Sequence, residues 1–124
     1  MRFLRFWKSL SWFIFILLIT FLPVSGSKKI RLFVHADKVI HLLLFFVFSL
    51  LLISDARRFF QTPSTEKNVA LVVIITGLMT ALFTELVQYF LIVARSGSIA
   101  DFLADISGII IGIGVYKMIF GKSK

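Results

Sequence analysis

Four long apolar stretches, separated by short polar or basic segments, constrain the fold of this 124-residue chain more than any other feature. They run over residues 7–24, 37–54, 69–93 and 99–120. Each approaches or exceeds the roughly 20 residues that an α-helix needs to cross a hydrocarbon core of about 30 Å. Hydrophobic residues make up 59% of the chain and the mean hydropathy is +0.99, which is more apolar surface than a soluble protein of this size can bury. The sequence therefore predicts an all-α integral membrane bundle of four transmembrane helices, forming a single domain over residues 1–124.

The first apolar stretch also fits a secretory signal peptide, because Arg2, Arg5 and Lys8 precede its apolar core. That core is bulky and aromatic, however, and Pro23 precedes a poor small-residue cleavage site. We therefore expect the segment to be retained as the first transmembrane helix.

The basic residues predict the orientation of the bundle. With four spans, one side of the membrane holds both termini and the loop after the second helix, and the other side holds the remaining two loops. The first side carries nine of the 14 Lys and Arg residues and the second side five. The positive-inside rule then places both termini in the cytoplasm. Because these residues lie in short runs between apolar segments, they favour contact with anionic lipid, and no nucleic-acid partner is expected.

Eight polar residues lie within or beside the predicted spans. A charged group in hydrocarbon costs at least about 2.5–3.5 kcal/mol, so each needs a structural or functional reason. In the predicted topology the second helix begins, the third ends and the fourth begins on the outer side of the membrane. The topology therefore gathers all eight in the outer half: Asp37, Lys38, His41, Glu85, Gln88, Arg95, Asp101 and Asp105.

Polar residues on three of the predicted helices have the same expected depth in the membrane. At 1.5 Å per residue, His41, Glu85 and Asp105 all lie roughly 7–8 Å outward of the midplane. The cluster holds four of the six acidic residues of the chain, against two basic side chains and one histidine. We therefore expect one carboxyl group to be protonated, or a cation or cationic ligand group to be bound, unless a lysine or arginine of the first loop folds over the cluster.

Small residues follow one face of the fourth predicted helix at a strict four-residue spacing. This stripe lets a neighbouring backbone approach closely, and it lies beside the aspartates of the same helix. The close approach could occur within the bundle or between two copies in a homo-oligomer, and the sequence does not separate these alternatives. The stripe consists of Ala100, Ala104, Gly108 and Gly112.

Several segments together resemble the VanZ-like family of small bacterial membrane proteins. The matching elements are Asp37-Lys38-Val39-Ile40-His41, then Thr84-Glu85-Leu86-Val87-Gln88-Tyr89-Phe90, and then Arg95, Asp101, Gly108 and Gly112. The family usually has asparagine where this chain has Asp105. The resemblance implies a protein of the bacterial cytoplasmic membrane and cell envelope. It also implies a possible link to glycopeptide susceptibility, since the founding member is associated with reduced susceptibility to teicoplanin. The resemblance implies no catalytic residues for this chain, because the family has none that are agreed.

These residues are compatible with three functions. The favoured one is binding of a lipid or lipid-linked cell-wall component, with Arg95 and Lys38 contacting phosphate or carboxylate. The second is an intramembrane hydrolase or transferase acting on a headgroup, with Glu85 or Asp101 as general base and His41 as the acid. The third is a small proton-coupled transporter in which Glu85 titrates.

No metal or other cofactor is expected from the sequence. His41 with Glu85, Asp101 and Asp105 could form a nitrogen-and-oxygen metal site, but the chain has only two histidines and no His-x-x-x-His spacing. Cysteine is absent, which excludes disulfides and thiolate zinc sites. The chain also has no Gly-x-Ser-x-Gly elbow, phosphate loop or dinucleotide-binding fingerprint.

Overall fold

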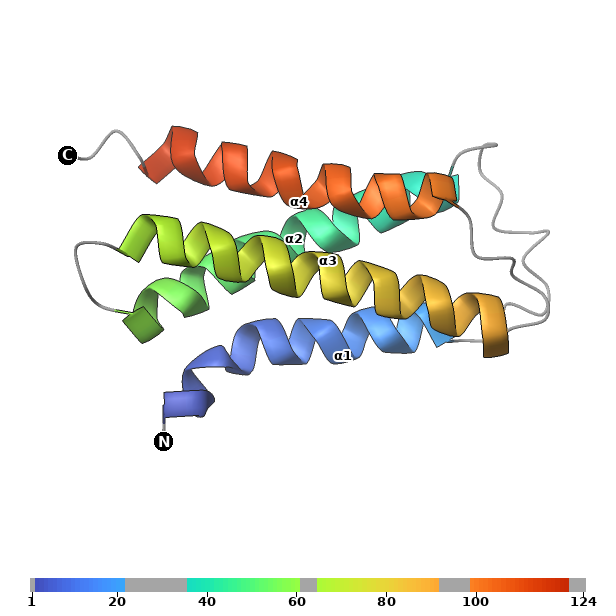
Figure 1. The fold of residues 1–124 in the computed structure, drawn as a ribbon, viewed down its shortest axis with the longest axis horizontal. Coiled ribbons are helices and arrows are strands. Elements are labelled where there is room, and N and C mark those ends of the chain that lie inside the picture. Colours follow the sequence, from blue (N-terminus) through green and yellow to red (C-terminus); the bar gives the residue numbers. More distant parts are fainter. Residues whose placement is uncertain (1, 22–35, 61–64, 92–98, 121–124) are drawn as a thin grey trace.

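The fold was analysed on a computed structural model, which describes residues 2–21, 36–60, 65–91 and 99–120 (Figure 1). All of these residues are helical, and none of them forms a strand. Four of the helices are long and apolar enough to cross a membrane, so the predicted fold class is confirmed. The elements are a 3₁₀ helix η1 (Arg2–Phe6) and the α-helices α1 (Trp7–Phe21), α2 (Ala36–Phe60), α3 (Thr65–Leu91) and α4 (Ile99–Phe120).

The four α-helices run alternately up and down, so that α1 begins and α4 ends at the same end of the bundle (Figure 1). Helix α2 contacts each of the other three and packs most extensively against α4. Among the described residues, α1 touches α2 and α3 but not α4. Helix α2 is therefore the central element of the bundle, and its inward-facing residues meet side chains from every other helix.

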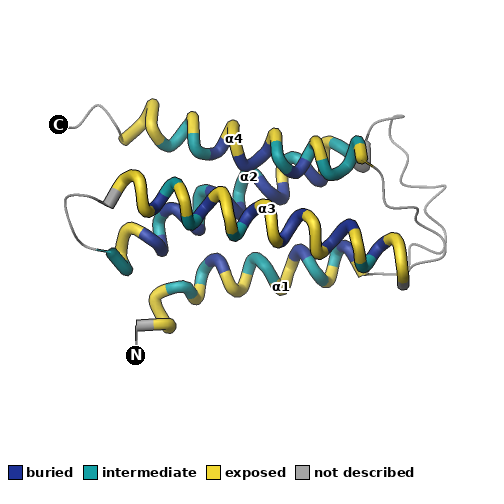
Figure 2. The backbone as a smooth tube through the Cα atoms, viewed as in Figure 1, coloured by how far each residue is buried: buried dark blue, intermediate teal, exposed yellow. Residues whose placement is uncertain are grey.

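The core lies along α2, and the outer faces of the bundle are apolar. Phe45 and Phe48 on α2 are almost completely buried, and they pack with Ile16 of α1, Val73 of α3 and Ile109 of α4. Figure 2 shows the buried positions gathered between the helices and the exposed ones turned outward. Because large aliphatic and aromatic side chains dominate the exposed positions, this surface suits lipid rather than water.

Two helices extend beyond the apolar stretches that predict them. Helix α2 continues to Phe60 instead of ending at residue 54, and α3 begins at Thr65 instead of residue 69. Hydropathy marks where lipid-compatible side chains stop, whereas a helix is held by its backbone hydrogen bonds and can continue past the apolar stretch. Arg57 lies in the extension of α2 and donates a 2.9 Å hydrogen bond to the Tyr116 hydroxyl of α4. The predicted ends at residues 22–24 and 92–93 lie outside the described residues.

The small residues of α4 allow it to approach the backbone of α2. A Cβ atom added at Gly108 would collide with the Leu42 carbonyl oxygen and lie 2.9 Å from the Phe46 nitrogen. One added at Gly112 would collide with the Ser49 hydroxyl. These two glycines thus pack within the bundle, and the close contact sets the register between α2 and α4. Ala104 and Ala100, one and two turns before Gly108, are half-buried.

Candidate functional site

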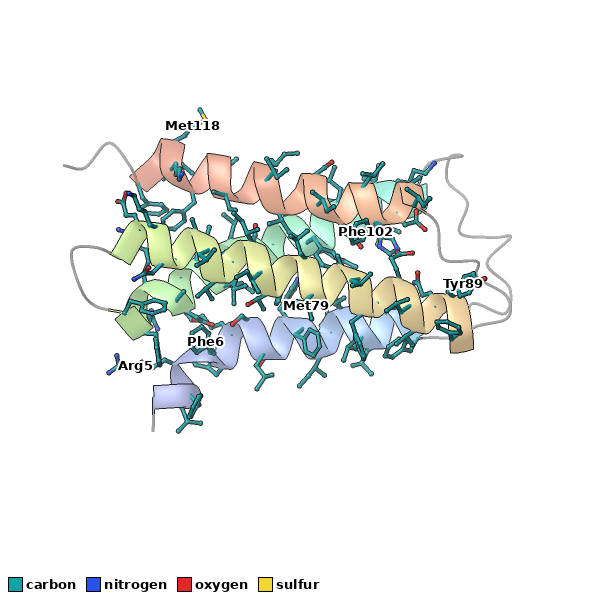
Figure 3. The ribbon with its side chains drawn as sticks, viewed as in Figure 1. Arg5, Phe6, Met79, Tyr89, Phe102 and Met118 are labelled. Carbon is teal, nitrogen blue, oxygen red and sulfur yellow. The ribbon has the colours of Figure 1, made fainter. Side chains whose placement is uncertain are left out.

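Buried polar side chains gather at the end of the bundle where α2 begins, α3 ends and α4 begins. We call this region the polar end and define it by His41, Glu85, Gln88 and Asp105. Tyr89 and Phe102 mark it in Figure 3, whereas Arg5 and Phe6 mark the opposite end. Each of the four side chains is at least nine-tenths buried. Neighbouring helices therefore shield them on most sides.

A hydrogen bond between His41 and Asp105 joins α2 to α4 at the polar end. The distance from His41 Nδ1 to Asp105 Oδ1 is 2.9 Å. Asp105 is fully buried and His41 is 8% exposed. The close packing at Gly108, one turn along α4 from Asp105, holds the two helices near enough for this bond. A carboxylate bound to one imidazole nitrogen fixes the ring orientation and leaves the other nitrogen for a ligand or a proton.

Glu85 brings a third titratable side chain to the same point from α3. One donor atom from each of His41, Glu85 and Asp105 lies within 4.8 Å of the other two. The three residues come from three different helices. An imidazole and two carboxylates at this spacing can bind a cation, share a proton or accept hydrogen bonds from a polar headgroup.

Gln88 Nε2 and Asp105 Oδ2, both at the polar end, lack a hydrogen-bond partner among the described residues. Gln88 lies one turn beyond Glu85 on α3 and is 2% exposed. A buried donor or acceptor without a partner costs about 1–3 kcal/mol, so this region has capacity for a polar ligand.

The remaining predicted site residues are less enclosed or lie outside the described part of the chain. Lys38 and Asp101 are half-buried, and Asp101 lies in the first turn of α4. Asp37 lies in the first turn of α2, but its side chain is outside the described part. Arg95 lies entirely outside the described residues.

The threonine hydroxyls of α3 serve the helix itself. Thr80 Oγ1 donates to the Thr76 carbonyl oxygen at 2.8 Å, and Thr84 Oγ1 donates to that of Ala81 at 2.9 Å. Both side chains are buried. Their hydrogen bonds are satisfied within α3, so they contribute packing rather than free polar groups to the polar end.

Sequence reasoning missed a third buried acid, Asp55, at the opposite end of the bundle from Glu85 and Asp105. It is fully buried, and its Oδ2 accepts hydrogen bonds from the backbone nitrogen and hydroxyl of Ser9 on α1, each at 2.9 Å. Asp55 follows the expected end of the second span by one residue, so it lies outside the predicted spans and outside the predicted cluster. Nothing in the sequence around Asp55 indicates that its partner is Ser9 in another helix.

Comparison with known proteins agrees with the resemblance found in the sequence. A family model described as VanZ/LLP1 matches residues 2–120, which is nearly the whole chain and includes all four α-helices. No curated protein and no solved structure matches the chain significantly.

Proposed function

This chain belongs to the VanZ/LLP1 family, and on that premise we propose that it binds the headgroup of a lipid or lipid-linked cell-wall component. Binding takes place at the polar end, within the bacterial cytoplasmic membrane. Membrane lipids are thus both its solvent and the source of its ligand. The observation that carries this proposal is the pair of buried polar atoms, Gln88 Nε2 and Asp105 Oδ2, without partners among the described residues.

The polar end offers both donors and acceptors to such a headgroup. Gln88 can donate through its amide nitrogen, and Asp105 can accept through Oδ2. Both belong to an otherwise apolar bundle, where an unmatched polar group is costly. A headgroup with hydroxyl, amine or phosphate groups supplies the complementary partners, while its acyl or polyprenyl chain lies along the exposed apolar faces of the helices.

Orientation decides which leaflet supplies the ligand. With both termini in the cytoplasm, the polar end faces the outer leaflet, where lipid-linked cell-wall precursors are exposed. Lys38 lies near the start of α2, and Arg95 lies in sequence between α3 and α4, so both basic residues are close in sequence to this end. They would contact the phosphate or carboxylate of the headgroup.

Binding to protein in lipid nanodiscs tests the proposal. The probes are a phospholipid with a labelled headgroup and a labelled polyprenyl diphosphate-linked cell-wall precursor. We expect Gln88→Leu and Arg95→Ala each to weaken binding of one of these probes at least tenfold. Arg57→Ala, which removes a basic side chain at the opposite end, is the matched control and should bind normally. Equal binding by all four proteins would refute the proposal.

The link to glycopeptides is a separate part of the proposal. If the bound headgroup belongs to a cell-wall precursor, expression of the chain in a teicoplanin-susceptible bacterium should raise the inhibitory concentration of teicoplanin. Gln88→Leu should abolish that rise. An unchanged inhibitory concentration, with the protein present in the membrane, would remove the glycopeptide role and leave headgroup binding to be judged by the nanodisc assay.

The hydrogen bond between His41 and Asp105 favours a second candidate function, an intramembrane hydrolase or transferase. A carboxylate that orients an imidazole prepares it for proton transfer, and Glu85 lies close enough to share in the reaction. Lipid analysis of cells that express Glu85→Gln distinguishes the two functions. An enzyme predicts that one lipid product disappears relative to wild type, whereas a binding protein predicts an unchanged lipid composition.

A further inference from the structure

We propose that His41, Glu85 and Asp105 form a binding site for one divalent transition-metal ion, of which Zn²⁺ is the representative. The ion would lie at the polar end, held by side chains from α2, α3 and α4. This inference rests on the proposed function only for the identity of the anionic ligand that the ion would bind.

The spacing of the donor atoms suits a single ion. In a tetrahedral Zn²⁺ site with bond lengths of about 2.0–2.2 Å, adjacent ligand atoms lie about 3.3–3.6 Å apart. His41 Nδ1 and Asp105 Oδ1 are separated by 2.9 Å, so a small outward shift of the two side chains makes room for an ion between them. All three donor atoms lie within 4.8 Å of one another, so a rotation of the flexible Glu85 side chain brings the third into range.

The ligand types narrow the choice of ion. One imidazole nitrogen and two carboxylates form a mixed nitrogen-and-oxygen set, which Zn²⁺ and other first-row transition metals accept. Mg²⁺ and Ca²⁺ prefer oxygen ligands only, and Mg²⁺ retains several waters. An apolar, nearly water-excluded position therefore favours a transition-metal ion over either of these two.

Charge and burial supply independent support. A dication with two carboxylates and a neutral imidazole has no net charge, which lowers the cost of holding the acids inside a membrane bundle. Asp105 is fully buried, and its Oδ2 has no hydrogen-bond partner among the described residues. An ion bound to His41 Nδ1 and Asp105 Oδ1 would replace the hydrogen bond between these two atoms, because a nitrogen that ligates a metal carries no proton. It would give the buried carboxylate a cationic partner.

Three protein ligands leave a coordination position open, as in catalytic zinc sites. Gln88 lies one turn from Glu85, and its buried Nε2 is available to donate to whatever fills that position. A phosphate or diphosphate oxygen bound to the ion could accept this hydrogen bond. The ion would thereby explain how a cluster that is rich in carboxylates attracts an anionic headgroup.

The sequence predicts no metal, because the chain lacks a local histidine pair. Such a pair marks sites whose ligands share one helix. Here each ligand comes from a different helix, so no short spacing could reveal the site.

Zn²⁺ alone is the first probe. Protein purified in detergent and stripped with a chelator is titrated with Zn²⁺ against a fluorescent zinc indicator. We expect one ion per chain with micromolar or tighter affinity, and no displacement by millimolar Mg²⁺ or Ca²⁺. Bound Co²⁺ should add visible d–d absorption bands typical of low-coordinate nitrogen-and-oxygen ligation.

Variants identify the ligands. His41→Ala and the nearly isosteric Glu85→Gln and Asp105→Asn should each weaken Zn²⁺ binding at least tenfold while circular dichroism shows an intact helical fold. His35→Ala, which removes the other histidine of the chain, is the matched control and should bind like wild type. Absence of saturable Zn²⁺ binding to the folded wild type, or its loss in His35→Ala alone, would overturn the metal site.

The two proposals fail separately. Gln88→Leu should keep Zn²⁺ affinity but lose headgroup binding. If Zn²⁺ binds as expected but no headgroup probe binds, the metal site stands and the proposed function is wrong. If headgroup binding survives chelation and no Zn²⁺ binds, the proposed function stands and the metal site is wrong.

Discussion

Asp55 of α2 and Ser9 of α1 form a buried connection between the two helices, 46 residues apart in sequence. Both Ser9 donors reach the same carboxylate oxygen of Asp55 at 2.9 Å. Ser9 lies in the first turn of α1, where backbone N–H groups lack partners within the helix and an anion is stabilised. Together with the 2.9 Å hydrogen bond from Trp12 Nε1 to the Leu44 carbonyl oxygen, this contact fastens α1 to the bundle.

Removing the Asp55 carboxylate should therefore destabilise the bundle. Asp55→Ala leaves the Ser9 backbone nitrogen without its acceptor in a buried place, and the hydroxyl keeps only its 3.2 Å hydrogen bond to the Phe6 carbonyl oxygen. We expect a loss of about 1–3 kcal/mol in the free energy of unfolding. Ser9→Ala should cost less, because the backbone hydrogen bond to Asp55 remains. Reversible unfolding in mixed detergent micelles, followed by circular dichroism, measures both changes.

Ser11→Ala is the matched control for this pair of variants. The Ser11 hydroxyl is on an exposed position of the same helix and donates to the Trp7 carbonyl oxygen of its own turn. Its removal should change the free energy of unfolding by less than about 0.5 kcal/mol. A Ser11→Ala effect as large as that of Asp55→Ala would contradict a specific role for the buried contact.

Close packing between α2 and α4 gives a second prediction. Gly108→Ala introduces a methyl group against the Leu42 carbonyl oxygen, so α4 must move away from α2 at a cost of about 1–3 kcal/mol. The same shift should separate His41 from Asp105 and weaken binding of headgroup probes. Gly114→Ala, at a position with open space around the added carbon, should leave stability and binding unchanged. Equal stability of the two variants would show that Gly108 does not set the register of the helices.

The orientation of the bundle can be measured with single cysteines, because the chain has none of its own. We expect a membrane-impermeant maleimide to label Ser27→Cys and Ser98→Cys in intact cells. Ser64→Cys and Ser123→Cys should react only after the membrane is permeabilised. The opposite labelling pattern would place both termini outside and the polar end at the inner leaflet, contrary to the proposed source of the ligand.

Much of the site could be predicted from the sequence because membrane topology restricts depth. Once the four spans are identified, the start of α2, the end of α3 and the start of α4 must share one side of the membrane. That reasoning placed His41, Glu85 and Asp105 at one level, and the structure brings these three together. Depth does not fix rotation about the helix axis, however. The full burial of Asp105 and the half-burial of Asp101, one turn earlier on the same helix, depend on packing at Gly108.

The contacts at the opposite end could not be predicted in the same way. Hydropathy falls after residue 54 because acidic and basic side chains follow, which marks a membrane boundary but not the end of a helix. Asp55 is helical and buried, and Ser9 of α1 donates two hydrogen bonds to its Oδ2. This contact depends on how two helices that are distant in sequence pack together. No periodicity within either helix carries that information.

The central claim, that a headgroup binds at the polar end, is tested most directly by locating the bound ligand. A lipid or polyprenyl diphosphate probe with a photoreactive group in its headgroup is incorporated with the protein into nanodiscs and cross-linked by light. Mass spectrometry of the peptides should then find the probe on the beginning of α2, the end of α3 and the beginning of α4, with Gln88→Leu reducing the yield. Cross-links spread evenly over the bundle, or concentrated around Arg57 and Tyr116 at the other end, would contradict the claim.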